Sequence, residues 1–436
     1  MEDTTIMSSI IPDTRRYDID WLRVILFILL IWFHYAVFSL GQLEGKDSNM
    51  NMFNIPLFIV IAVMHQWRLA ALFVISGMGT AFAFRHRTWQ TYVMERGSRL
   101  GIPLLFSMFI LFFGIFNPIY SLVGLFTIFP GADNMPYGHL WFIYNLLIYS
   151  IILSPLFAHV RNNPEGSLVN FIRSILSIRH GLGILLLPPI VLAINGILFK
   201  PWAFGEVGMW WEFPRYLLYF LFGYLLISAK EEYFDAIDKL RITVTIVTPI
   251  FAIIWFTLQE SSDIPDVMDG GWVDYGFPAF SIGATFAALI QSLHAWFWCL
   301  LIFSWASKLL NKPNKYLAYL NEAVYPTYIV HLHITFLLIA IFGLLGIGYY
   351  INLVIGSILV LVSVLVCFEI TRRATYFRIV FGIKGGKEKV EKIYPYNKIQ
   401  NQNSQIAFTI LCHIMTVMMI IGLMMMMIFA EILSEF

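Results

Sequence analysis

Long apolar runs separated by short polar stretches are the dominant pattern along this chain. Most of the runs are about 17–25 residues long, the length that a helix needs to cross a bilayer, and they lack the alternation of barrel strands. The pattern therefore predicts a polytopic helix bundle. We expect membrane spans at roughly 21–40, 66–84, 100–118, 139–159, 181–199, 213–229, 242–258, 279–305, 323–345, 350–370 and 405–430.

Two shorter apolar stretches leave the number of spans open. The stretch 53–65 is either a re-entrant or interfacial segment that leads into the second span or an extension of that span, and 119–130 allows similar readings. We predict an all-α integral membrane protein with about 10–11 transmembrane helices. Its membrane domain is expected over 1–384, a basic cytoplasmic linker over 385–404 and an additional transmembrane helix over 405–436.

The composition points to the same class of protein. Hydrophobic residues make up 59% and charged residues 13% of the 436 residues, against about 45–50% and 25% in soluble domains. This excludes a soluble enzyme, a disordered chain and a disulfide-stapled secreted module. With 28 Lys and Arg against 27 Asp and Glu, binding to nucleic acid is not expected either. The three cysteines all sit in apolar runs, which argues against a disulfide or metal framework.

The distribution of basic residues predicts the orientation, because cytoplasmic loops retain Lys and Arg. With the N-terminus in the cytoplasm, 23 of the 28 basic residues fall on inside loops, 3 on outside loops and 2 within spans. An incorrect span parity would scramble this division. We therefore expect a multi-pass protein of the cell membrane, either plasma or inner, with a cytoplasmic N-terminus.

Ionisable residues within a span are costly and are functional candidates. Arg23 and His34 are eleven residues apart in the first span, which places them on one helix face about 16 Å apart along the axis. Asp20, one turn before Arg23, is placed to brace its guanidinium. The alternative is an arginine that extends to the interface and a histidine that bonds a neighbouring helix. The shared face favours a functional pair.

Arg96 and Arg99 lie one turn apart where the third span begins, and their forked donors suit a phosphate group. The alternative for them is ordinary positive charge on the cytoplasmic side. His331 and His333 point in different directions on a helix, so we expect one to face a site and the other to pack. Arg68 precedes the small residues Ser76, Gly77 and Gly79, which permit close helix packing or leave space for a ligand.

Three further residues complete the candidates from the chain. His139 and Trp141 begin the fourth span, where His139 is expected at the membrane interface. His294 is a single histidine within an apolar run, for which a satisfied structural hydrogen bond is the favoured interpretation.

Taken in order, these pieces resemble the membrane acyltransferase family 3, whose multi-span enzymes O-acylate sugars and other acceptors at the cell envelope. The pattern is closest to the glucan-succinylating type. The motifs that carry the resemblance are Ile19-Asp20-Trp21-Leu22-Arg23 followed by His34, Arg68 to Gly77, Arg96-x-x-Arg99-Leu100, His139-Leu140-Trp141-Phe142, Tyr328-Ile329-Val330-His331, and Arg372-Arg373 followed by Phe381-Gly382-Ile383-Lys384. The family core has about ten spans, so the stretch after residue 400 departs from it.

The resemblance implies a mechanism and assigns roles to these residues. It implies acyl-CoA as co-substrate, with acetyl-CoA or succinyl-CoA as candidates, and Arg96, Arg99 and Arg23 as ligands of its phosphates. His34 is the expected general base for an acceptor hydroxyl, with His331 next, because imidazole titrates near neutrality.

The acceptor implied by the resemblance is a hydroxyl of an envelope glycan or another molecule on the outer side. Substrate contacts are then expected from Arg68, His139 and Trp141. Direct transfer and a two-step route through an acyl-enzyme both remain open, and neither needs a metal. No partner beyond donor, acceptor and membrane lipid is implied.

The alternative function is a secondary transporter or flippase with a similar number of spans. Such proteins often contain repeated halves and acidic residues at mid-bilayer. The sequence contains no obvious repeat, and Glu369, near a cytoplasmic end, is almost the only acidic candidate within a span.

Overall fold

The computed structural model describes residues 15–40, 54–85, 87–116, 119, 138–199, 212–260, 280–373 and 375–383. These residues contain helices and no β-strand, which confirms the all-α fold class. The predicted linker 385–404, the predicted helix over 405–436 and almost all of the stretch 119–130 lie outside the described residues.

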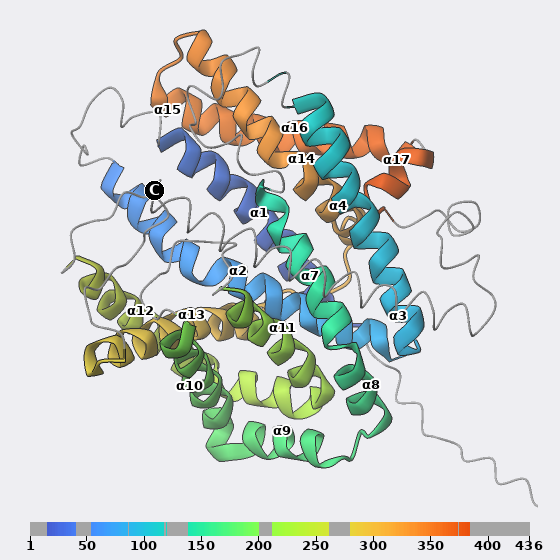
Figure 1. Ribbon diagram of the computed structural model, residues 1–436. Helices are drawn as coiled ribbons and strands as arrows, with labels where there is room; N and C mark the ends of the chain where they lie inside the picture. Colours follow the sequence, from blue (N-terminus) through green and yellow to red (C-terminus); the bar gives the residue numbers. More distant parts are fainter. Residues whose placement is uncertain are drawn as a thin grey trace, which may run out of the picture.

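The helices follow one another through short connections (Figure 1). The α-helices are α1 (Tyr17–Leu40), α2 (Asn54–Phe84), α3 (Trp89–Arg96), α4 (Ile102–Phe106), α7 (Trp141–Ile152), α8 (Ser154–Asn162), α9 (Ser167–Ser177), α10 (Leu182–Phe199), α11 (Glu212–Ser228), α12 (Lys230–Glu260), α13 (Ile282–Leu309), α14 (Leu317–Leu344), α15 (Tyr349–Ile351), α16 (Ser357–Arg373) and α17 (Thr375–Val380). Segments Gly97–Gly101, Ser107–Phe116 and Asn352–Gly356 are π-helical, and Gly138–Leu140 and Ile178–Gly181 form 3₁₀ turns.

Within the described residues, seven helices are long and apolar enough to cross a membrane, or eight if α7 and α8, which meet at 51°, form one bent span. This confirms a polytopic membrane bundle. The predicted spans 100–118 and 213–229 also coincide with helical segments, the run through α4 to Phe116 and α11. Because α2 begins at Asn54 and continues without a break, the apolar stretch 53–65 extends the second span. Which end faces the cytoplasm stays a prediction.

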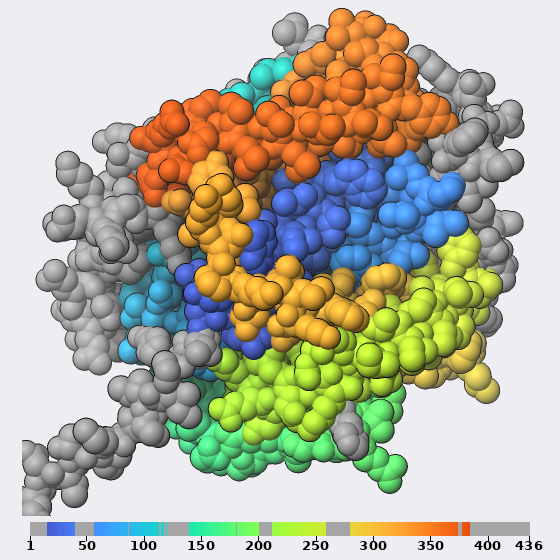
Figure 2. Space-filling view, turned by 180° about the vertical axis from the view of Figure 1, so that it is seen from behind, coloured from blue at the N-terminus to red at the C-terminus, as the bar shows by residue number. Residues whose placement is uncertain are grey.

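The outward face of α12 shows why this fold requires lipid. Ile242, Ile246, Ile250 and Ile253 recur every three or four residues and are all exposed, so they form one apolar stripe on the helix. Figure 2 shows α12 in yellow-green on the surface of the molecule. An apolar stripe of this length is stable against acyl chains and unfavourable in water.

Helix α1 occupies the interior of the bundle, in contact with α2, α13, α14 and α16. In Figure 2 it is the dark blue segment between the orange C-terminal helices and the yellow-green α12. The position of α1 brings its polar residues against α14, which follows it by almost 300 residues in the chain. This contact between distant segments creates the site described below.

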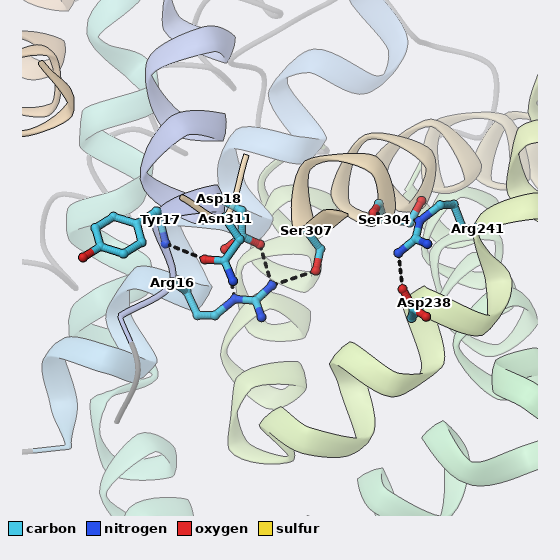
Figure 3. Close-up of polar contacts among 8 residues, drawn as sticks. All are labelled: Arg16, Tyr17, Asp18, Asp238, Arg241, Ser304, Ser307 and Asn311. Atoms are coloured by element: carbon cyan, nitrogen blue, oxygen red, sulfur yellow. Dashed lines mark hydrogen bonds and ion pairs between the residues drawn. The ribbon is translucent and has the colours of Figure 1, made fainter. Parts of the chain in front are cut away.

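The start of α1 and the residue before it are fixed to the end of α13 and the residues that follow it (Figure 3). Arg16 donates to Asp18 and to the Ser307 hydroxyl, with the latter bond 2.7 Å long, and the Tyr17 amide donates to the Asn311 side chain at 3.1 Å. These bonds satisfy polar groups at two helix ends at once. They hold the start of α1, and therefore Arg23, in a defined position.

Candidate functional site

Two facing helix surfaces build the candidate site. On α1, Arg23 and His34 are separated by eleven residues and therefore share a face. On α14, Asn321, Tyr328 and His331 are spaced by seven and three residues and form a second face. Because α1 packs against α14, the two faces lie side by side, with charged residues at the helix ends and a histidine pair deeper in the bundle.

His34 and His331 form a direct hydrogen bond, with 2.9 Å between Nδ1 of His34 and Nε2 of His331. Nδ1 of His331 lies 2.6 Å from the carbonyl oxygen of Tyr328. A carbonyl only accepts, so His331 Nδ1 carries the proton and its Nε2 is the acceptor in the neutral ring. His34 then donates from Nδ1, which leaves the lone pair on its Nε2. The hydrogen-bond partners thus select the tautomer that a general base needs.

His139 holds α14 next to this pair. Its Nε2 donates to the carbonyl oxygens of Tyr328 and Ile329, each 3.1 Å away, while the Tyr328 hydroxyl donates to the carbonyl oxygen of His139. The His139 and His331 rings are 4.9 Å apart between centroids. His139 is 8% exposed and therefore buried in the bundle. Its expected level at the membrane interface stays a prediction. Burial is tolerated because its ring Nε2 and its backbone carbonyl oxygen both form hydrogen bonds with α14.

Arg68 is a buried cation at the edge of the histidine cluster. Its side chain is 1% exposed, and its guanidinium carbon lies 3.6 Å from the centre of the Phe33 ring. Its Nε and Nη1 have no hydrogen-bond partner among the described residues. Within the part of the chain that the structure describes, no carboxylate pairs with it. It lies within electrostatic range of His34 and Tyr328. A buried charge without a counter-ion is costly and indicates an anionic ligand or transition state.

A cavity of about 620 Å³ opens between the ends of α1, α2, α3 and α14. Arginines dominate the polar part of its wall, and only two carboxylates accompany them. This charge balance favours an anion. The charged lining residues are Arg15, Arg16, Arg23, Arg87, Arg96, Arg99, Asp20 and Glu95.

The ion pairs of the cavity distinguish its arginines. Glu95 bonds Arg87 at 2.6 Å and Arg99 at 2.7 Å, and Asp20 lies 3.4 Å from Arg23. Arg96 donates instead to the hydroxyl of Thr80, at 3.3 Å. Arg96 is therefore the mouth arginine whose charge is least compensated within the described residues. It lines the same cavity as Arg99 and Arg23.

Three aromatic side chains close the inner end of the cavity. Ring centroids are 5.6 Å apart for Phe27 and Tyr328, 5.8 Å for Phe142 and Tyr328, and 6.1 Å for Phe27 and Phe142. We call Phe27, Phe142 and Tyr328 the aromatic barrier. Of the residues that the structure describes, the cavity wall contains these three and no histidine, so the barrier separates the arginine cluster from the histidine pair.

The remaining candidates, Trp141, His294 and His333, do not line the cavity. Trp141 packs between Phe73 and Tyr216, and His333 stacks on Phe116 with 4.0 Å between ring centroids. As predicted, His331 and His333 therefore have different surroundings. His294 stacks on Trp255, but neither of its ring nitrogens has a hydrogen-bond partner within the described ranges. The interpretation of His294 as a satisfied structural histidine was wrong.

Sequence reasoning missed several residues of the cavity wall, among them Arg87, Thr80, Tyr325 and Asn321. The face of α14 offered a signal, because Asn321, Tyr325 and Tyr328 precede His331 at helical spacing. Arg87 offered none, since its role depends on how α2 turns into α3. Within the described residues, no group of three or more His, Cys, Asp and Glu side chains is arranged to hold a metal ion.

Comparison with known proteins adds to this geometry. Residues 16–372 match acyltransferase family 3, described as an acyltransferase domain. The glucans biosynthesis protein C of Escherichia coli (strain K12) and that of Shigella dysenteriae serotype 1 (strain Sd197) are each 26% identical over 166 residues. The similar stretch covers 36% of this chain and 43% of each relative, so the chain spans less than half of their length. No solved structure matches the chain significantly.

Proposed function

Because the chain belongs to acyltransferase family 3 and is a multi-pass membrane protein, we propose that it transfers an acyl group from cytoplasmic acyl-CoA to a hydroxyl on the outer side of the cell membrane. The acyl group is acetyl, succinyl or similar, and the acceptor is an envelope glycan or another hydroxyl compound. The hydrogen-bonded pair of His34 and His331, in line with an arginine-rich cavity, carries this proposal.

The arginines of the cavity are suited to the phosphates of the donor. Arg96, Arg99 and Arg23 would hold them with forked, charge-assisted hydrogen bonds. The spacing along α1 supports phosphate binding at the arginines and acyl transfer at the histidines, because Arg23 and His34 are about 16 Å apart along the helix axis. An extended thioester-bearing arm bridges such a distance. Its thioester would reach the histidines after the side chains of the aromatic barrier move aside.

The histidine pair is suited to move one proton. The acceptor's hydroxyl proton would pass to Nε2 of His34 while the hydroxyl oxygen forms a bond to the thioester carbonyl carbon. The carbon–sulfur bond then breaks, and the leaving thiolate takes the proton back from His34. His331, fixed by the Tyr328 carbonyl, accepts from Nδ1 of His34 and stabilises the imidazolium. An acyl-histidine intermediate would use the same lone pair.

Arg68 is suited to the oxyanion that forms at the thioester carbonyl. Its guanidinium is buried near His34 and lacks a carboxylate partner among the described residues. Donors fixed in a water-poor site stabilise developing charge without reorganising during the reaction. His139 would act through α14, because it bonds two carbonyls of that helix.

The test uses purified protein in detergent or liposomes with labelled acyl-CoA and a hydroxyl acceptor. Replacing His34 with Ala removes the general base, and we expect kcat to fall about 10²–10⁴-fold while acyl-CoA still binds. His159→Ala, on the exposed part of α8, is the matched control and should leave kcat unchanged.

Two results would contradict the proposal. Full activity of the His34→Ala protein would remove His34 from the chemistry. A wild-type protein that neither binds acyl-CoA nor is stabilised by it would favour the transporter. Mass analysis of envelope glycans with and without the gene would identify acyl group and acceptor together.

A further inference from the structure

Asn321 of α14 has a buried side-chain amide. Both Nδ2 and Oδ1 are enclosed by protein and form no hydrogen bond with the part of the chain that the structure describes. Leaving such groups unpaired is costly, and few native side chains remain so. Asn321 also belongs to the wall of the arginine-rich cavity. An unpaired amide beside a binding cavity indicates a ligand that supplies both missing bonds.

The level of Asn321 in the bundle narrows the choice of ligand. Asn321 precedes His331 by ten residues, or about 15 Å along the helix axis, much as Arg23 precedes His34 on α1. It therefore lies close to the level of the arginines and one turn before Tyr325, far from the histidine pair. A group bound there belongs to the part of the donor next to its phosphates and not to the acyl group.

The chemistry of the Asn321 side chain narrows the choice of ligand further. A carboxamide offers one acceptor and two donors and carries no charge. Its natural complement is another neutral group that both donates and accepts, such as an amide. A phosphate offers acceptors only, and an alkyl chain offers neither. The pantetheine arm of acyl-CoA carries two amides between its thioester and its phosphates, one close to each end.

We propose that Asn321 is a specificity-determining residue that binds the amide of the donor's pantetheine arm nearest the phosphates. This inference rests on the proposed function, since it assumes an acyl-CoA donor. The amide of Asn321 pairs with that of the arm, Nδ2 donating to its carbonyl oxygen and Oδ1 accepting from its N–H. The site thereby recognises the carrier arm independently of the acyl group that it delivers.

The experiment compares three donors that carry the same acyl group: acyl-CoA, acyl-pantetheine and acyl-N-acetylcysteamine. The first two contain the amide nearest the phosphates, and the third keeps only the amide nearest the sulfur. For Asn321→Ala we expect KM to rise about 5–30-fold with acyl-CoA and acyl-pantetheine. With acyl-N-acetylcysteamine, KM should be the same as for the wild type.

Asn352→Ala provides a matched control. Asn352 is also a buried amide, but its Oδ1 accepts from the Tyr35 hydroxyl at 2.5 Å and it does not line the cavity. Asn352→Ala removes a buried amide away from the cavity and therefore shows the effect of weakening the bundle alone. We expect its KM to stay unchanged with all three donors. If the Asn321→Ala protein folds poorly, the proposal can still be tested on the wild type. The donor is then an acyl-pantetheine analogue with an ester in place of the amide nearest the phosphates. Its KM with wild-type protein should rise by a similar factor.

The outcomes separate the two proposals. A wild type that turns over acyl-CoA, combined with an Asn321→Ala protein of unchanged KM, would overturn the role of Asn321 alone. An equal loss with all three donors would also overturn it, because it would indicate a structural role. A wild type that neither binds nor turns over any of the donors would overturn the proposed function itself.

Discussion

Arg68 illustrates how a single residue can combine function with a cost in stability. Its guanidinium is buried with two nitrogens unpaired and is supported by the Phe33 ring. The ring offsets part of the cost of burial through a cation–π contact of up to about 2 kcal/mol. No hydrogen bond to Nε or Nη1 from the described residues offsets the rest of the cost; sequences often break such rules at functional sites.

We expect Arg68→Met to lower kcat and raise thermal stability at the same time. Loss of one oxyanion donor costs about 10²–10³-fold in kcat, while removal of an unpaired buried charge favours folding. The measurements are initial rates and the melting temperature of the same purified protein. Arg68→Lys keeps the charge and should retain more activity than Arg68→Met. A parallel loss of activity and stability in Arg68→Met would show that the arginine only packs.

At the scale of the element, the crossing of α2 and α11 depends on two glycines. A Cβ added at Gly77 would overlap the carbonyl oxygen of Phe220, and one added at Gly223 would overlap that of Val74. The backbones therefore touch where the glycines face each other, as in other close crossings of membrane helices. From the sequence, Gly77 could serve either close helix packing or space for a ligand, and the structure assigns it to packing.

Gly223→Val should therefore destabilise the bundle, because the obstacle is rigid backbone that cannot move aside. The expected cost is about 1–3 kcal/mol or more, typical of overpacking, and it should appear as a lower melting temperature in detergent. Gly348→Ala is the control, since an added Cβ there meets nothing within 4 Å and stability should stay within about 0.5 kcal/mol of the wild type. Equal melting temperatures of the two variants would contradict the close crossing.

The positions of the helices in the chain were largely predictable from the sequence. Which helices pack against one another was not. Apolar length alone located α1 and α14, because a span must satisfy its backbone internally. The bond between His34 and His331 joins residues 297 positions apart, and no local pattern specifies which helices become neighbours. Asn321 was missed for a related reason: a polar residue near a helix end is ordinary until a cavity beside it is known.

The whole molecule concentrates positive charge at one end of the cavity. Six arginines and two carboxylates line it, so its field should attract a polyanionic donor before any specific contact forms. Arg96→Gln should weaken the binding of acyl-CoA more than Arg99→Gln does, because Glu95 already compensates Arg99. Dissociation constants at low and high salt would measure this. The dependence of affinity on salt should become weaker in the Arg96 variant, and equal effects of the two changes would contradict the ranking.

The aromatic barrier determines which molecules can pass from one side of the protein to the other. The cavity contains arginines at its mouth and Phe27, Phe142 and Tyr328 at its inner end. A molecule that enters this dead end must leave through the mouth. A spent carrier thiol would thus return to the compartment it came from, where it can be recharged, while only the group it carried moves on. The acyl group alone would cross the protein, in one direction, and no whole molecule would pass through it.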